Sequence, residues 1–347
     1  MKTRKISHRE KGGSLLGEGV TGKTVNAGCR PGGNSFCKEI EGQEDTIQKI
    51  RLYLVKTSPT DITSKEEIQA FIQFVHTVKR TIAKVIKEPP PFLHTTRKAL
   101  FLGELDSNRR INRLYGKKAE DYLTVAPLEY KTHDILGAEV FLSSRSPIYV
   151  LFGQKCKNRF ELQSSQRLLT WVEHILKSLV ILQDKKYMHN DIKPDNTVLC
   201  ENTFKMIDWG FACPMDYLSF KRMDGDDMFV SPIRWYITGV PKEEAFEKLR
   251  AKTKRKEKSL FYSNVWKEFY AYLEMEVNSA ISLQLTREQL FQRYKKSLDC
   301  MMIGFTIVKV VHDSSLSWVT WKPIVEALTS HTHPLSAEQA LKLIQKI

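Results

Sequence analysis

The sequence of 347 residues predicts an α+β protein in which short strands precede most of the helices. The first observation is a set of β-favouring runs in the amino-terminal half, over residues 17–24, 48–56 and 148–152. The second is the stretch 165–185, where apolar residues recur every three or four positions, as on the buried face of a helix. The order predicts a strand-rich first part and a helical second part. The apolar positions of this helix are Leu168, Val172, Ile175, Leu179 and Leu182.

Three glycines near the start of the chain form a candidate phosphate-binding loop with the pattern GxGxxG. Glycine has no side chain, so such a turn lets the backbone approach phosphate oxygens closely. The same stretch also matches GxxxxGKT, in which Lys23 would contact phosphates and Thr24 would bind Mg²⁺. Residues 25–33 contain helix breakers and no helical periodicity, which favours a strand–turn–strand over the strand–helix of that second motif. The candidate nucleotide-binding residues are Gly17, Glu18, Gly19 and Gly22.

An octapeptide and a tripeptide further along combine the groups that phosphoryl transfer requires. HNDIKPDN covers residues 189–196, and the tripeptide DWG covers residues 208–210. A carboxylate can take the proton of an attacking hydroxyl, and carboxylate and amide oxygens suit Mg²⁺. The residues between the two motifs read as two strands joined by a turn at 201–203, which would hold the ligands rigidly. The candidate site residues are Asp191, Lys193, Asn196 and Asp208.

The glycine loop, HNDIKPDN and DWG together resemble the eukaryotic-type protein kinase family. The resemblance implies a bilobal protein-kinase fold, with a β-rich N-lobe and a mainly helical C-lobe, that uses ATP and Mg²⁺. By the family pattern Asp191 accepts or orients the hydroxyl proton and Lys193 lies beside the transferring phosphate. Asn196 and Asp208 would bind Mg²⁺. A lysine two residues after the aspartate resembles the serine/threonine-specific branch.

A further element of the resemblance is a lysine on the third strand, paired with a glutamate on the following helix. Lys56 ends the β-favouring run 48–56 and resembles this lysine, while Lys49 is the rival. Glu67 is the expected partner, although a glutamate in a first helical turn can also serve only the helix dipole. The short spacing from Lys56 to Glu67 resembles the casein-kinase-one and vaccinia-related branch.

Other positions match or depart from the family pattern. Asp299 resembles the aspartate that ties down the catalytic loop, and a simple helix-start carboxylate is the alternative. Ile233 stands where the family has a glutamate. Asn190 replaces an arginine that reads phosphate on the activation loop, so switching by such a phosphate is less expected. Trp209 replaces a phenylalanine, as it does in casein kinase two.

Helix-breaking residues and composition indicate where the lobes and their insertions lie. Prolines 89–91 end a helical stretch, and the chain is expected to continue irregularly toward residue 146. The combination of an enlarged N-lobe, inserted helices and a short carboxyl-terminal part resembles the arrangement in divergent kinases of large DNA viruses. We predict a basic tail (1–11), an N-lobe (12–152) with insertions near 29–44 and 88–146, and a C-lobe (153–347) with a helical insertion near 238–298.

The chain is strongly basic, with 54 Lys and Arg against 40 Asp and Glu and a net charge of +14. Such a field attracts acidic proteins or nucleic acid, and its densest stretch is residues 250–258, where a solvated helix face is the plainer interpretation. We expect protein substrates, acidic or nucleic-acid partners through this surface, and no membrane insertion, because no apolar run approaches the ~20 residues of a membrane span.

Six scattered cysteines indicate reduced thiols, because they form no CxxC pair. His331 and His333 are interpreted as surface residues without function. The absence of an apolar signal segment at the start favours a cytoplasmic or nuclear protein, and the viral resemblance implies a virus-encoded protein in its host cell.

Three functions remain open. The first is an ATP-dependent serine/threonine protein kinase. The second is a small-molecule phosphotransferase, because Asn190 also occurs in choline-kinase-like and aminoglycoside-phosphotransferase-like enzymes, although those generally lack a glycine at the position of Gly210. The third is a pseudokinase scaffold, which would have to rest on the altered framework, since each residue that carries chemistry is retained.

Overall fold

The computed structural model describes residues 17–18, 22–26, 40, 43–77, 81–86, 96–123, 128–143, 145–154, 156, 161–221 and 230–347. The predicted basic tail, Gly19 and most of the first predicted insertion lie outside these residues. The chain divides into two compact units. Unit 1 comprises Met1–Arg113 and Leu123–Asn158, and unit 2 comprises Leu114–Tyr122 and Arg159–Ile347.

Unit 1 is built on an antiparallel sheet of eight strands, in the order β1-β2-β5-β8-β7-β3-β4 with β6 beside β7. Two helices, described below, pack on this sheet. This strand-rich unit and the mainly helical unit 2 together confirm the predicted α+β class. The strands are β1 (Gly17–Glu18), β2 (Gly22–Asn26), β3 (Ile47–Leu54), β4 (Thr60–Ile62), β5 (Thr81–Ile86), β6 (Leu128–Tyr130), β7 (His133–Leu142) and β8 (Ile148–Gln154), and η1 (Glu44–Thr46) precedes β3.

The two faces of the sheet are covered by different helices, α2 (Lys65–Thr77) and α3 (Arg97–Tyr115). Alternate residues of β8 separate the two sides: Val150 packs in the cluster that includes α2, and Leu151 in the cluster that includes α3. This is the period of two that a strand buried on both faces requires.

The prediction of irregular chain after the three prolines is wrong over α3 and β7. Thr96 caps α3 by accepting a hydrogen bond from the N–H of Ala99 at 3.1 Å. Phe101, Leu105 and Ile111 form its buried stripe. These apolar positions are interrupted by many charged residues, so the helical period is weak in the sequence.

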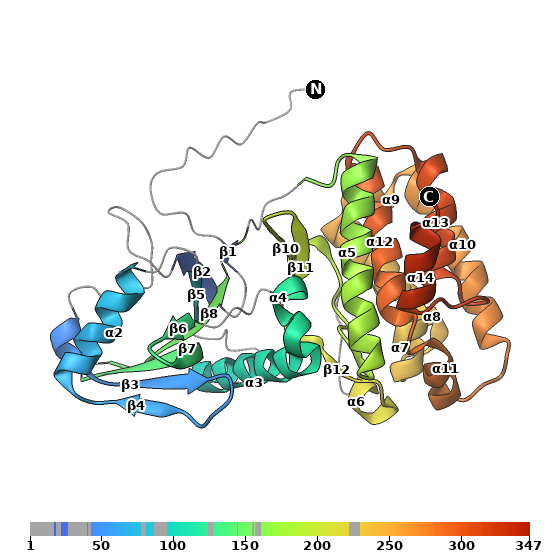
Figure 1. Cartoon of the computed structure of the whole chain (residues 1–347). Coiled ribbons are helices and arrows are strands. Elements are labelled where there is room, and N and C mark those ends of the chain that lie inside the picture. The colour runs from blue at the N-terminus through green and yellow to red at the C-terminus, as the bar shows by residue number, and fades with distance from the viewer. Residues whose placement is uncertain are drawn as a thin grey trace. The chain divides into compact units, whose positions relative to one another are not determined.

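Unit 2 is mainly helical, and α5, α12 and α14 lie side by side in it (Figure 1). Four short strands form two pairs, β9 with β12 and β10 with β11. The elements are η3 (Gly116–Lys118), α4 (Ala119–Tyr122), α5 (Ser165–Asp184), β9 (Tyr187–Met188), η4 (Pro194–Asn196), β10 (Thr197–Cys200), β11 (Thr203–Met206), η5 (Trp209–Phe211), β12 (Cys213–Pro214), α6 (Tyr217–Lys221), α7 (Pro232–Thr238), α8 (Lys242–Lys256), α9 (Lys258–Phe261), α10 (Asn264–Ile281), α11 (Arg287–Tyr294), α12 (Leu298–Asp313), α13 (Trp318–Thr329) and α14 (Ala337–Ile344).

The predicted helix over 165–185 and the predicted hairpin after the octapeptide are both confirmed. Ser164 caps α5, and its apolar stripe is fully buried. The stretch 238–298 contains α8, α9, α10 and α11.

One expectation about composition needs correction, namely that the cysteines are reduced thiols. Cys156 and Cys200 are disulfide-bonded, although Cys213 and Cys300 are free and buried. Sequence spacing does not report which cysteines the fold brings into reach.

In the part of the chain that the structure describes, no helix has the length and apolar character needed to cross a membrane.

Candidate active site

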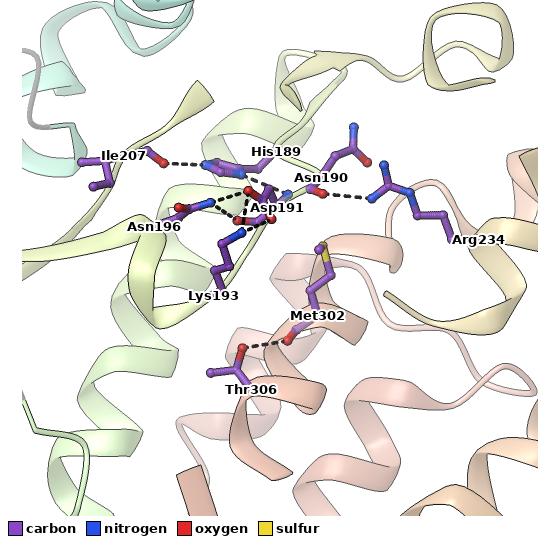
Figure 2. A network of polar contacts seen from close by, with 9 residues as sticks. All are labelled: His189, Asn190, Asp191, Lys193, Asn196, Ile207, Arg234, Met302 and Thr306. Carbon is purple, nitrogen blue, oxygen red and sulfur yellow. Dashed lines mark hydrogen bonds and ion pairs between the residues drawn. The ribbon is translucent and has the colours of Figure 1, made fainter. Parts of the chain in front are cut away.

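Asp191 lies in the loop between β9 and η4, at the centre of a polar network (Figure 2). Its side chain is buried and accepts hydrogen bonds from two residues of the same loop. Nζ of Lys193 donates to Oδ1 at 2.9 Å and to Oδ2 at 3.0 Å. Nδ2 of Asn196 donates to Oδ2 at 2.6 Å and to the backbone carbonyl of Asp191 at 2.9 Å. These contacts fix the carboxylate and supply the positive charge that a buried carboxylate needs.

The backbone of this loop is fixed from α12 and α7. Oδ2 and Oδ1 of Asp299 accept the backbone N–H groups of His189 and Asn190, each at 2.8 Å. The guanidinium of the buried Arg234 donates to the carbonyl of Asn190 at 2.9 Å. Asp299 also lies in the first turn of α12. It is therefore both a helix-start carboxylate and the residue that holds the backbone of this loop. Sequence reasoning missed Arg234.

Asn190 has a left-handed backbone with φ of 66°, which asparagine tolerates better than most residues. Its Nδ2 donates to the carbonyl of Phe211 at 3.2 Å and to Sγ of Cys213 at 3.1 Å. An uncharged amide therefore joins the loop to the segment after DWG, where a phosphate-reading arginine was expected in the family. Burial raises the pKa of the Cys213 thiol to about 12, so this thiol stays protonated.

The hairpin of β10 and β11 connects Asn196 to Asp208. The N–H of Ile207 donates to the carbonyl of Asn196 at 2.9 Å, which ties the two ends of the hairpin together. Asp208 follows with a left-handed backbone, φ 61° and ψ 71°, and its carboxylate is exposed and does not cap the turn after it. A non-glycine residue holds this conformation at a free-energy cost of about 1 kcal/mol or more, which the surrounding structure must offset.

His189 and Trp209 form the apolar support beneath these polar groups. Their ring centroids lie 4.5 Å apart, and both side chains are buried. Burial lowers the pKa of His189, so its ring is neutral. Nδ1 accepts the N–H of Asp191 at 3.3 Å, which leaves Nε2 as the N–H that faces the carbonyl of Ile207 at 3.3 Å. Trp209 is thus a buried packing partner of the His189 ring.

Asn196 and Asp208 carry oxygen atoms of the kind that could hold a magnesium ion. Asn196 uses Nδ2 for Asp191, so its Oδ1 is the atom left for a ligand, and Asp208 contributes an exposed carboxylate. Hard oxygen donors of this kind suit Mg²⁺, which usually takes few protein ligands and completes its shell with phosphate and water. Within the described residues no group of three or more His, Cys, Asp or Glu side chains is placed to hold a metal by itself.

The glycine motif of unit 1 forms a hairpin of β1 and β2, with Gly17 opposite Thr24 and Glu18 opposite Lys23. This confirms the predicted strand–turn–strand and contradicts the strand–helix that GxxxxGKT would need. Gly22 begins β2, and Gly19 lies outside the described residues.

The prediction that Lys56 stands on the third strand and pairs with Glu67 is wrong. Lys56 is exposed in the bend after β3, and Glu67 pairs with Lys131 at 3.6 Å. Lys49 pairs with Asp61 at 3.4 Å. The physical reason is topology: β3 lies between β7 and β4, far along the sheet order from the β1–β2 hairpin.

The strand beside the glycine hairpin is β5, and its sequence TIAKVI carries Lys84. Lys84 is in register with Leu151 of β8, and Leu151 packs in the cluster that includes α3. Glu104 lies on α3 next to the buried Leu105, which belongs to that same cluster. The sequence signal for this strand was a lysine, Lys84, inside the β-branched run TIAKVI. The prediction chose the similar run that ends at Lys56 instead.

His331 is buried, with 1% of its surface exposed, so its interpretation as a surface residue is wrong. Its Nε2 lies 3.1 Å from Oγ of Ser231, two residues before the Ile233 that replaces the family's glutamate.

The basic stretch 250–258 lies in the last half of α8 and the start of α9. Acidic residues begin α8 and basic residues end it, an order that suits the helix dipole.

Comparison with known proteins gives two partial matches, and no family model matches. Over 87 residues, 24% of this chain, the sequence is 34% identical to the dual specificity protein kinase YAK1 of Saccharomyces cerevisiae. Over 67 residues, 18% of this chain, it is 36% identical to the mitogen-activated protein kinase kinase kinase 8 of Rattus norvegicus. The matches span 10% and 14% of those proteins. The chain is thus similar to protein kinases over a small part of its length, and its α+β architecture is compatible with their fold.

Proposed function

We propose that this protein is an ATP- and Mg²⁺-dependent serine/threonine protein kinase, with unit 1 as its N-lobe and unit 2 as its C-lobe. The observation that supports this most is the constraint on Asp191. Its carboxylate is held by Lys193 and Asn196, and the two peptide N–H groups before it are held by one carboxylate, that of Asp299. A base fixed this tightly is what a reaction that depends on positioning requires.

In the proposed reaction Asp191 orients the substrate hydroxyl and accepts its proton. The hydroxyl oxygen forms a bond to the γ-phosphorus while the bond from that phosphorus to the bridging oxygen of ADP breaks. Lys193 carries the compensating positive charge: its ammonium contacts Asp191 and is partly exposed, so it can also contact an incoming phosphate.

We assign Asn196 and Asp208 to Mg²⁺. The ion, when bound, neutralises the charge that develops on the phosphate oxygens. The hairpin between the two ligands sets their spacing, and the contact of Asn196 with Asp191 links the position of one ligand to that of the base.

We assign Lys84, in place of Lys56, to the nucleotide phosphates, with Glu104 as its partner. The support is the position of β5 next to the glycine hairpin and the register of Lys84 with Leu151, which packs in the cluster that includes α3, the helix that carries Glu104. The backbone of the hairpin, from Gly17 to Gly22, would cover the phosphates.

Transfer of labelled γ-phosphate from Mg-ATP to the protein itself and to a generic protein substrate tests the proposal. Asp191→Asn should reduce transfer at least about a thousandfold, the scale expected for loss of a base and its positioning. The matched control is Asp195→Asn, an exposed carboxylate of the same loop, which should change the rate less than about twofold.

The products distinguish the competing functions. Phosphate bound to serine or threonine of protein supports the proposal, and phosphate on a small hydroxylated molecule with none on protein contradicts it. Equal, background-level transfer by the native protein and Asp191→Asn, with nucleotide binding intact, would favour a pseudokinase scaffold.

A further inference from the structure

A buried carboxylate on α10 organises the turn that follows α13. Glu276 is 5% exposed, and its Oε2 accepts hydrogen bonds from Oγ of Ser330 at 3.1 Å, from the N–H of Thr332 at 2.9 Å and from the N–H of His331. Burial acts to raise the pKa of Glu276, and these donors outweigh it, so the pKa is lowered and the carboxylate stays charged. Residues 330–332 are therefore fixed around one anion.

The side chain of His331 points from this turn to the start of α7. Its Nε2 lies 3.1 Å from Oγ of Ser231. Its ring packs edge-on against Tyr294 at 5.6 Å, and the Tyr294 hydroxyl donates to the His331 carbonyl at 3.0 Å. Burial lowers the pKa of His331 to about 4, so the ring is neutral and its Nε2 can accept the hydroxyl proton of Ser231.

Ser231 in turn is the N-cap of α7, where its Oγ accepts the N–H of Ile233 at 3.4 Å. One turn into α7, Arg234 donates to the carbonyl of Asn190 at 2.9 Å, at the peptide bond that leads into Asp191 (Figure 2). A continuous set of hydrogen bonds and one short helix thus connects His331 to the backbone of the candidate base.

We propose that His331, held by Glu276, is a positioning residue that fixes Ser231 and α7 and thereby keeps Arg234 against the loop that carries Asp191. The inference rests on the proposed function for its catalytic consequence. Ile233 has no charge to anchor the start of α7, and the neutral contact of His331 with Ser231 supplies an anchor there.

The first experiment compares His331→Phe with His331→Gln. Phenylalanine keeps the ring packing on Tyr294 but cannot accept from Ser231, whereas glutamine keeps an acceptor. We expect His331→Phe to lower kcat about tenfold, with KM for ATP changed less than about twofold, and His331→Gln to restore most of the rate. Thr306→Val is the matched control, because Thr306 is also buried and its hydroxyl donates within its own helix α12, to the carbonyl of Met302 at 3.0 Å.

Backbone hydrogen exchange supplies a readout that needs no catalysis. In His331→Phe the amides of residues 189–191 should exchange about tenfold faster, while those of α5 stay within about twofold of the native protein. If transfer activity is absent from the native protein but this pattern appears, the proposed function fails and the positioning role stands.

A double-mutant cycle tests whether the effect passes through Arg234. If it does, Arg234→Met and His331→Phe combined should accelerate exchange at residues 189–191 little more than either change alone. Fully additive effects, equal acceleration of exchange throughout unit 2, or an unchanged kcat in His331→Phe would each overturn the proposal.

Discussion

Nδ2 of Asn196 donates to Oδ2 of Asp191 at 2.6 Å, so the proposed metal ligand and the proposed base are in direct contact. This amide cannot be exchanged for a carboxylate without placing two negative charges together in a buried loop.

The first prediction is therefore that Asn196→Asp is more damaging than a loss of one metal ligand would suggest. Aspartate keeps the oxygen for Mg²⁺ but repels Asp191, so we expect transfer to fall at least about a hundredfold at pH 7.5. Initial rates measured over a range of Mg²⁺ concentrations check this. A rate that returns to the native value at high Mg²⁺ would mean that the contact with Asp191 is unimportant.

The second prediction concerns Asp299, whose two oxygens accept the N–H groups of His189 and Asn190. Asp299→Asn leaves only one acceptor oxygen and places an NH₂ group against a buried N–H. The free energy of unfolding should fall by about 1–3 kcal/mol, and transfer should fall as the loop loosens. Urea unfolding and initial rates measure both, with Asp313→Asn as the control, since that residue lies at the other end of α12 and is exposed. Equal losses in the two variants would contradict a special role for Asp299.

The third prediction decides which lysine serves the nucleotide. Lys84→Met should reduce kcat/KM for ATP at least about a hundredfold, because the proposed contacts of Lys84 with the phosphates and with Glu104 are both lost. Lys56→Met should change it less than about twofold, since Lys56 is exposed beyond the end of β3. Initial rates over a range of ATP concentrations separate the two, and the reverse order of effects would restore Lys56.

The contrast between Lys56 and Lys84 also marks how far sequence reasoning reached. The octapeptide loop, its hairpin, the glycine hairpin and the helix α5 are local, so spacing and periodicity predicted them. The position of a strand within a sheet depends on pairing with strands that are distant in sequence. The runs that carry Lys56 and Lys84 look alike, so their places in the sheet cannot be predicted without knowing which strands they pair with.

Burial of polar residues was the other gap. His331 and Arg234 are buried, and each bonds a partner that is distant in sequence: Ser231 lies 100 residues from His331, and Asn190 lies 44 residues from Arg234. The buried Glu276 likewise accepts from Thr332, 56 residues further on. Such contacts follow from the packing of helices, and composition or spacing alone does not predict them.

The fourth prediction concerns Gly304, where α12 meets α13. A Cβ at this position would collide with the methyl group of Thr329 and contact Leu328 at 3.5 Å. Gly304→Ala should therefore lower the free energy of unfolding by about 1–3 kcal/mol through overpacking, despite the higher helix propensity of alanine. Gly103→Ala in α3 is a matched control, because nothing lies within 4 Å of a Cβ there, and it should be neutral or stabilising in thermal unfolding. A Gly304→Ala variant as stable as the native protein would show that the two helices can move apart freely.

The fifth prediction follows from the titration of His331. Burial lowers its pKa from 6.5 to about 4, partly offset by Glu276, so the unfolded chain binds a proton at this residue before the folded protein does. Its contribution to stability is therefore complete above pH 6.5 and is lost as the pH falls toward 4, by about 1.4 kcal/mol per pH unit and about 3 kcal/mol in total. His331→Gln removes this titration while keeping an acceptor for Ser231. Urea unfolding at pH 7, 6 and 5 should show the native protein losing stability more steeply than the variant, with contributions from other groups cancelling in the difference. Parallel curves for the two proteins would mean that His331 is protonated as readily in the folded state as in the unfolded chain.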